Sequence, residues 1–431
     1  RRAWPKSLVD GIQMSHPVYT SSPDIDNALV DSAHWSDMQW IHDQFTWLRQ
    51  HDPLRRMEPT GFDPFWSVTK YDHIKEIELA KDVFLSAPIT SLEPIMLREA
   101  LQTMSGRENV IRSLVQMDEP DHMKYRVLTQ AWFSRSNLKN IEIEVARLAT
   151  DYVDRLVKHK EQCDFVKQVA IPFPLRVIMS ILGVPEEDEA FMLKLTQELL
   201  GPDDPDNHRS FDSTELMDVV RDFEQYFDAL AKKRRSNPTD DLATAIANGK
   251  INDGPMPDLE TYGYYIIVAT AGHETTAAAI SGALLALIEN PDQLETLRSD
   301  IDANIDGFVE ESLRWISPVR HFVRTAVEDY VLDGQLIPKN ESVALWYPSG
   351  NRDENKFSNS QKFDISRSPN KHVAFGHGAH LCLGQHLARM EIRALFKELL
   401  SRVHDVRLID QYRYTHTAFV GGLKSLPIQT S

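Results

Sequence analysis

The spacing of apolar residues along the chain predicts helices far more often than strands. In the segment 37–51, Ile41, Phe45 and Leu48 recur at the spacing of one helical face. The same period runs through longer stretches, which are 121–201, 213–235 and the apolar segment that ends at Asn290–Pro291. Residues 86–116 show no clear period and mix Ser, Pro and Gly with apolar residues, which indicates a mobile lid.

Strand signals are short and confined to a few regions. Leu54–Met57 and Phe65–Thr69 flank a turn-rich stretch, and Asp72 is expected to cap the helix that follows. The tail is expected to form a hairpin around Gly421–Gly422. The chain has no internal repeat. We therefore predict a single domain over 1–431, mainly α with small β-sheets, whose β-rich portions are 52–70, 327–348 and 415–430.

Charge and cysteine content narrow the class of protein. The 431 residues carry 47 Lys and Arg against 64 Asp and Glu, a formal net charge of −17, which argues against nucleic acid as a partner. Two cysteines in so long a chain cannot form a disulfide framework, so a reducing cytoplasm is expected. Arg1–Lys6 lacks the apolar segment of a secretion signal. The stretch 262–288 carries His273 and Glu274 at its centre, so we predict a buried helix and no membrane span.

The most specific motif is the glycine-rich segment Phe375–Gly384, which contains Cys382. Gly376, Gly378 and Gly384 allow positive φ and a close approach of the backbone to a flat partner. A helix is predicted directly after this segment, and its N-terminal amides would favour a thiolate at Cys382. A thiolate ligand pushes electron density onto haem iron and favours cleavage of the O–O bond. A buried structural cysteine is the alternative.

A second motif, Ala271–Thr276, lies in the middle of the long apolar helix. Gly272 and the two threonines cost that helix roughly 2 kcal/mol relative to alanine. A threonine hydroxyl can also bond to the carbonyl four residues earlier and bend the helix. Such a break makes a groove for a small ligand, beside which Glu274 and Thr275 offer an acid and a hydroxyl that can relay protons. An ordinary helix with a surface His–Glu pair is the alternative.

Two further pairs carry little information alone. Glu311 and Arg314 have the spacing of an i,i+3 ion pair, which is common on helix surfaces and contributes roughly 0.2–0.5 kcal/mol. His122 and Arg126 share one helical face, and such a face is more often solvated than functional. Both pairs gain meaning only from the rest of the chain.

Together these segments resemble the motifs of the cytochrome P450 family, in particular its bacterial, ferredoxin-dependent, terpineol-hydroxylase-like members. The resemblance covers nearly the whole chain and implies a triangular prism of helices with haem b between the long central helix and the cysteine loop. It implies that Cys382 binds the iron and that Glu274 and Thr275 are catalytic. The other residues implied to contact the haem are Phe375, Gly376 and, at its propionates, His122, Arg126, Arg324 and His380. A structural cluster is implied for Glu311, Arg314 and Arg367.

The implied reaction inserts one atom of O2 into a C–H bond of a small hydrophobic substrate, a terpenoid or an alkyl or aryl hydrocarbon. Electrons would come from a ferredoxin and its NAD(P)H-dependent reductase, and the ferredoxin would meet the basic residues Lys124, Arg126, Arg135 and Arg389. The expected substrate contacts are Ile267, Ala271, Val319, Phe322, Phe419 and Val420, with the lid residues Ile95, Met96 and Leu97. Arg320 and His321 are unusual neighbours for such a pocket. A peroxide-driven hydroxylase and a non-catalytic haem protein that binds ligands are the alternatives.

Overall fold

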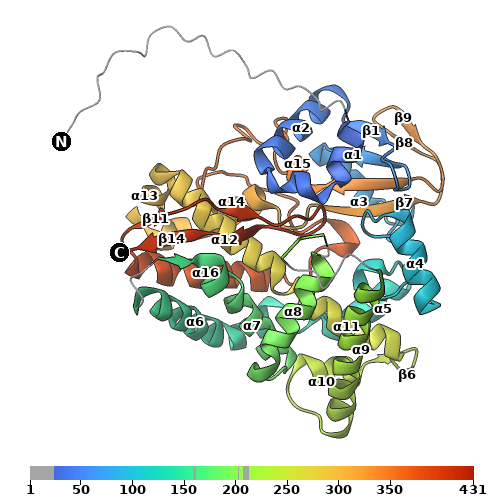
Figure 1. The fold of residues 1–431 in the computed structure, drawn as a ribbon, viewed down its shortest axis with the longest axis horizontal. Helices are drawn as coiled ribbons and strands as arrows, with labels where there is room; N and C mark the ends of the chain where they lie inside the picture. Colours follow the sequence, from blue (N-terminus) through green and yellow to red (C-terminus); the bar gives the residue numbers. More distant parts are fainter. Residues whose placement is uncertain (1–23, 159–161, 202, 207–212) are drawn as a thin grey trace.

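A computed structural model describes residues 24–158, 162–201, 203–206 and 213–431, so the predicted absence of a signal in 1–6 lies outside the described residues. Helices form most of the molecule, and a small sheet lies at one side of it (Figure 1). The mainly α fold with small sheets that the periodicity predicts is confirmed. Within the described residues, no helix is long and apolar enough to cross a membrane.

The helices fall into long and short groups. Those of eight residues or more are α2 (Met38–His51), α3 (Tyr71–Leu79), α4 (Ile95–Ser105), α5 (Asp121–Gln130), α6 (Arg135–Lys158), α7 (Pro172–Leu182), α8 (Glu189–Leu200), α9 (Ser213–Ser236), α11 (Asp258–Ala271), α12 (Glu274–Glu289), α13 (Pro291–Ser299), α14 (Ile301–Ile316) and α16 (Gln385–Arg402). The shorter turns are α1 (Ile25–Val30), η1 (Ser32–Ser36), η2 (Leu114–Gln116), η3 (Val166–Ala170), η4 (Glu186–Asp188), α10 (Leu242–Ala247), α15 (Tyr347–Gly350) and η5 (Gly378–His380).

The largest sheet has five strands in the order β1 (Leu54–Met57), β2 (Phe65–Val68), β10 (Ser342–Trp346), β7 (His321–Ala326) and β3 (Phe84–Leu85). Neighbouring strands are antiparallel except β2 and β10, which are parallel. A second sheet joins β11 (Val406–Leu408), β14 (Pro427–Thr430) and β4 (Cys163–Asp164). The remaining strands pair as β5 (Lys250–Ile251) with β6 (Gly254–Pro255), β8 (Tyr330–Leu332) with β9 (Gln335–Ile337), and β12 (Arg413–Tyr414) with β13 (Leu423–Ser425).

Local chemistry explains where the first long helices begin. The Asp37 carboxylate accepts a hydrogen bond from the Trp40 amide at 3.0 Å, which caps α2, and the predicted apolar face of α2 is buried. The expectation that Asp72 caps the next helix is wrong. The helix α3 starts one residue earlier, at Tyr71, whose amide is held by Asp353 at 2.9 Å. Asp72 lies inside the first turn, where its charge still favours the positive end of the helix dipole.

Two expectations about irregular segments also change. Residues 86–116, predicted to be an irregular lid, contain the regular helix α4, which ends at Gly106 in the left-handed conformation. The hairpin predicted within 418–429 is wrong: β13 pairs with β12, which precedes that span, and the last strand, β14, joins another sheet. The strand pairs that form depend on residues distant in sequence, which the local pattern does not encode.

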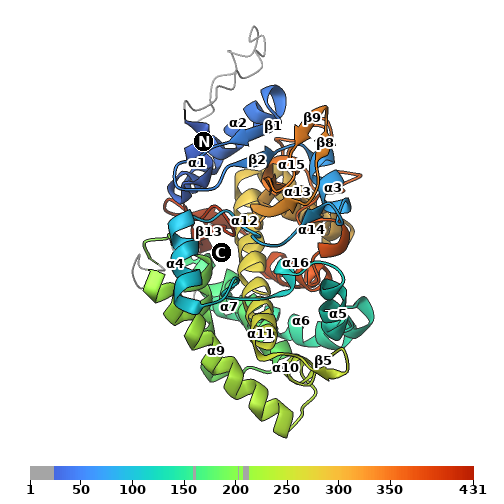
Figure 2. The same ribbon diagram turned by 90° about the vertical axis from the view of Figure 1, so that its right-hand side faces the viewer.

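The predicted long helix is divided into α11 and α12, which run through the middle of the molecule between the main sheet and α9 (Figure 2). Backbone hydrogen bonds end with the Gly272 amide bonding to Val268 and resume with the Ala277 amide bonding to His273. Between them, the Thr275 hydroxyl donates to the carbonyl of Ala271 at 2.9 Å. The predicted break and the predicted threonine back-bond are therefore both confirmed.

Candidate active site

The cysteine loop places Cys382 between η5 and the first turn of α16. Its amide donates to the carbonyl of Phe375 at 2.9 Å, which closes the loop. Gly376 and Gly378 both have φ of +68°, a conformation that favours glycine. At Gly378 a Cβ atom would lie 2.4 Å from the carbonyl oxygen of Glu78, so no larger residue fits there without movement of the backbone. The loop thus holds the sulfur in one position.

The groups around Cys382 favour the thiolate form of its side chain once a cation binds the sulfur. Burial raises the pKa of the Cys382 thiol, whereas the amides of Gly384 and Gln385 and the side chains of Arg126 and Arg389 act in the opposite direction. The other cysteine, Cys163 in β4, has no comparable donors among the described residues. Burial raises its pKa to about 11, so it remains an inert thiol.

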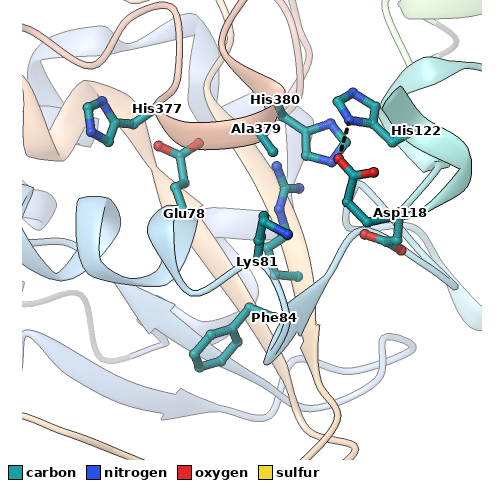
Figure 3. Close-up of a pocket in the computed structure, with 10 residues that line it drawn as sticks. Glu78, Lys81, Phe84, Asp118, His122, His377, Ala379 and His380 are labelled. Carbon is teal, nitrogen blue, oxygen red and sulfur yellow. Dashed lines mark ion pairs between the residues drawn. The ribbon is translucent and has the colours of Figure 1, made fainter. Parts of the chain in front are cut away.

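A small pocket beside the loop collects basic side chains from three elements. The rings of His122 of α5 and His380 of η5 lie close together, with centroids 4.1 Å apart and planes tilted by 34° (Figure 3). Arg324 of β7 lines the same pocket. Burial, followed by the nearby charges of Arg324, His122 and Arg126, lowers the pKa of His380 to about 2. Positive charges on these side chains therefore repel one another, and the side chains can bind a negatively charged ligand.

Three acidic residues, Glu78, Asp118 and Glu119, also line this pocket, and burial weakens the ionisation of Glu78. Burial raises the pKa of Glu78 to about 7, although Arg324 and the hydroxyl of Tyr347, 2.8 Å away, oppose the rise. Within the described residues the side chain of Arg324 hydrogen-bonds only to the carbonyl of Val323. The Glu78–Tyr347 contact and the hydrogen bond between Ser86 and His380 were missed from the sequence, because no local pattern marks them.

On the opposite side, the break between α11 and α12 presents Glu274 and Thr275. Glu274 lines a cavity of about 370 Å³ together with Ala277 and Ala278. Residues of α8, β12 and β13 form other walls of this cavity. His273 lies fully buried beside Glu274, with Nε2 3.4 Å from Oε1. The break therefore joins an acid and a hydroxyl to an open space.

The structure brings together part of the predicted substrate set. The rings of Phe322 and Phe419 meet edge to face at 5.7 Å, and Val319 pairs with Val420 in an isolated β-bridge. Two other predicted contacts lie one turn apart on α11, at Ile267 and Ala271. Of all six residues, Val420 alone lines the large cavity described above.

Other residues near the predicted pocket point elsewhere. Met96 is 83% exposed, so it does not line an enclosed pocket. His321 is buried, and its ring bonds to the carbonyl of Ala418 at 2.9 Å and to the amide of Leu92 at 3.0 Å. The Arg320 guanidinium lies over the ring of Trp35 at 4.6 Å. The two unusual residues therefore serve the packing of neighbouring segments.

The predicted structural cluster is fully assembled. The Arg314 guanidinium donates to both oxygens of Glu311 at 2.8 and 2.7 Å, and Arg367 reaches the same carboxylate at 3.1 Å. Arg314 also donates to the backbone carbonyls of Asn351, Ser360 and Lys362. Since Glu311 and Arg314 are 0% exposed, this is a buried ion network and not a surface pair.

The basic residues proposed to meet a ferredoxin are less free than the sequence indicates. Arg389 pairs with Glu310 at 3.0 Å, and Lys124 pairs with Asp121 at 3.1 Å. Arg126 turns inward and donates to the carbonyl of Leu381 at 2.7 Å. Arg135, the first residue of α6, is exposed.

Comparison with known proteins decides the family. A family model described as Cytochrome P450 matches residues 33–404. The chain belongs to the cytochrome P450 family. Cytochrome P450-terp from a Pseudomonas species is 40% identical over 92% of this chain and 94% of that protein. Linalool 8-monooxygenase from Pseudomonas putida is 32% identical over 90% and 95%. The crystal structure of CYP108D1 from Novosphingobium aromaticivorans has a TM-score of 0.88 and 39% identity, and the match covers 96% of this chain and 100% of that chain.

The chain is therefore a P450 monooxygenase, and its family implies a haem cofactor. The residues present fit that group. A fixed cysteine sulfur lies at the start of α16, where backbone amides face it. Beside it, Arg324, His122 and His380 line one pocket, and Arg126 reaches the loop at Leu381. Of the three acidic residues that also line the pocket, burial weakens the ionisation of Glu78, Asp118 accepts from the amides of Ser86 and Ala87, and Glu119 lies 3.8 Å from His122. The cationic donors suit the two carboxylates of a haem.

Proposed function

We propose that this P450 is a single catalytic domain over 1–431 that hydroxylates a C–H bond of a small hydrophobic substrate, a terpenoid or an alkyl or aryl hydrocarbon. One oxygen atom of O2 enters the product, and the other leaves as water with two protons and two electrons. The observation that carries the proposal is the broken helix, which sets Glu274 in the wall of a cavity with Thr275 directly after it, on a chain that holds Cys382 in a closed loop.

The proposed cofactor is haem b. Cys382 would hold its iron, His122, Arg126, Arg324 and His380 would hold its propionates, and Phe375 and Gly376 would lie in the loop beside it. When bound, the haem supplies the site at which O2 is reduced. Around it the chain contributes fixed charges and excludes water from the reacting centre.

The residues on the helix break would handle protons. The Thr275 hydroxyl, which donates to Ala271, can accept and pass on a proton, and Glu274 can supply one from the cavity side. The apolar residues Val319, Phe322, Phe419 and Val420, with Ile267 and Ala271, would contact the substrate. A wall with few polar groups suits a hydrocarbon, and the similarity to a protein named for linalool favours a terpenoid.

The proposed electron donor is a ferredoxin with an NAD(P)H-dependent reductase, in the cytoplasm. An acidic protein of net charge −17 needs a local basic face to attract an acidic partner. Arg135 is the exposed candidate for that face, whereas Arg389 and Lys124 are already paired with carboxylates. Free cysteines at 163 and 382 are consistent with a reducing compartment.

The test is the Thr275→Ala variant, assayed with terpenes and alkyl or aryl hydrocarbons in the presence of ferredoxin, reductase and NADH. We expect substrate binding, seen as a shift of the Soret band, to remain, while product per NADH falls and hydrogen peroxide rises. Thr270→Ala is the matched control, because Thr270 makes the same bond to the carbonyl four residues earlier but is buried. An unchanged product yield in the Thr275 variant would contradict the proposed role.

The two alternatives predict other results. A peroxide-driven hydroxylase would turn over faster with peroxide alone than with ferredoxin and NADH. A non-catalytic haem protein would bind the hydrocarbon but form no product with either source of oxidant. Labelled oxygen from 18O2 in the product would support the monooxygenase reaction directly.

A further inference from the structure

The break in the central helix is closed by two side chains, and only one of them belongs to the acid and hydroxyl pair. The Thr275 hydroxyl donates a hydrogen bond to the carbonyl of Ala271, and the ring Nδ1 of His273 donates one to the carbonyl of Ala269 at 2.9 Å. His273 is 0% exposed and lies on the side of the break away from solvent. It therefore holds the broken turn in shape from the inside.

The bond to Ala269 determines which nitrogen of His273 carries a proton. A carbonyl oxygen only accepts, so Nδ1 must be the N–H donor. In a neutral ring Nε2 then has a lone pair, and it faces Oε1 of Glu274 at 3.4 Å. Neither of these two buried atoms has a hydrogen-bond partner among the described residues. Two acceptors facing each other without a proton are unfavourable, and one proton between them removes the conflict.

We propose that His273 and Glu274 share one mobile proton between Nε2 and Oε1, and that His273 positions and recharges Glu274 for proton delivery. The proposal rests on the hydroxylase function given above. In the resting pair the proton lies on either atom, as an imidazole with a carboxylic acid or as an imidazolium with a carboxylate. Glu274 releases this proton toward Thr275, and a proton from water in the cavity replaces it.

The cavity provides the route for replacement. Its walls include Glu274 itself and four other charged residues, which are Lys167 of η3, Asp206 after α8, Arg413 of β12 and Lys424 of β13. Lys424 is paired with Asp206 at 2.7 Å, so part of this charge is internally balanced. On the other side, His273 meets the backbone carbonyl of Ala269. The proton pair thus has a polar side that faces water and a buried side that fixes the tautomer.

Nitrogen-15 NMR of the histidine-labelled holoenzyme tests the shared proton without turnover. The reduced enzyme with bound carbon monoxide is diamagnetic, and loss of a resonance in His273→Asn assigns His273. We expect Nδ1 to stay protonated from pH 5 to 9, and Nε2 to keep its proton to a higher pH in the wild-type enzyme than in Glu274→Gln. The glutamine amide can donate to Nε2 without a mobile proton. Identical Nε2 titrations in the two proteins would overturn the proposal.

The positioning role is tested by the pH dependence of coupling in His273→Asn. Asparagine can still donate to the Ala269 carbonyl from the place of Nδ1, but it has no group in the place of Nε2. We expect product per NADH to fall severalfold at pH 8 and much less at pH 6, where solvent protons recharge Glu274 directly. His42→Asn, at a buried histidine of α2, is the control and should leave the pH profile unchanged.

Equal losses of coupling at both pH values would show a purely structural effect and would overturn the role of His273. If the wild-type enzyme forms no product, the hydroxylase function fails, but the NMR titration still decides whether the proton is shared.

Discussion

The two sides of the candidate haem site are built by different means. The cysteine side, residues 311–314 and 364–384, is held by the backbone and by a buried ion network around Glu311. The cavity side, residues 92–96, 203–206, 271–276 and 413–424, depends on contacts between single side chains across gaps in regular structure. A metal ligand needs one fixed position, whereas substrate entry and proton transfer need local opening. The fold therefore places several overlapping backbone and ionic contacts on the side that must not move.

The largest effect is expected from Arg314→Met on the cysteine side. It leaves the buried Glu311 carboxylate with Arg367 as its one cationic partner among the described residues, and it removes the Arg314 donor from the carbonyls of Asn351 and Ser360. Breaking a buried ion network by removing one partner costs about 3–5 kcal/mol. We expect that loss in the free energy of unfolding from urea titration, together with weaker haem retention.

The control for this variant is Arg393→Met, which removes a partly exposed cation paired with the largely exposed Asp306. Exposed pairs contribute about 0–1 kcal/mol, so this variant should resemble the wild type. If the two changes lowered the free energy of unfolding equally, burial would not make the network on the cysteine side stronger than an exposed ion pair.

The second prediction concerns pH and His321 on the cavity side. Burial, and then the charge of Arg320, lowers the pKa of His321 from 6.5 to about 4, although its bond to Ala418 opposes this. A histidine with a depressed folded pKa contributes its full stability above pH 6.5 and loses it as pH falls through 4. The expected contribution to acid destabilisation is about 3 kcal/mol between pH 7.5 and pH 4.

His321→Gln isolates that contribution. Glutamine can still accept from the Leu92 amide, but it does not titrate, so the variant should lose less stability than the wild type on acidification. Urea unfolding at pH 7.5 and pH 4 gives the loss in free energy of unfolding for each protein. Subtracting the loss in the variant from the loss in the wild type removes the effects of other buried histidines. Parallel losses in the two proteins would show that His321 is not a source of the acid sensitivity.

The sequence identified the cysteine side well because its chemistry is local. Phe375–Gly384 is one short segment whose glycines and cysteine must follow one another to shape a loop, and the break at Ala271–Thr276 is likewise a property of neighbouring residues. The pair Glu311 and Arg314 was visible by spacing alone. Its complete burial was not, because burial depends on the carbonyls of residues about 40 positions later.

The cavity side was read less accurately because its contacts join distant segments. Nothing in the sequence around His321 indicates that its ring links Leu92 to Ala418. Met96 was grouped with pocket residues by its apolar character, yet α4 turns it outward. In such segments the partner of a side chain is decided by tertiary packing and not by local pattern.

The smallest effect is expected from Asp204→Asn, which weakens the link between the loop after α8 and the hairpin of β12 and β13. Asp204 is 0% exposed, accepts from the amide of His416 at 3.0 Å and forms an ion pair with Lys424. Asparagine keeps an acceptor for that amide but loses the charge, at a cost of about 1–2 kcal/mol. Asp302→Asn, in an exposed pair with Lys397, is the matched control.

Because the loop after α8 and the hairpin both line the large cavity, loosening their contact should release a bound ligand faster. We expect severalfold faster dissociation in Asp204→Asn, measured by stopped-flow change of the Soret band, with haem retention unchanged. The cysteine side should not respond, since the two regions share no contact at Asp204. If the dissociation rate stays constant while stability falls, the Asp204 link serves only folding. The cavity side would then open to ligand less readily than the comparison of the two sides indicates.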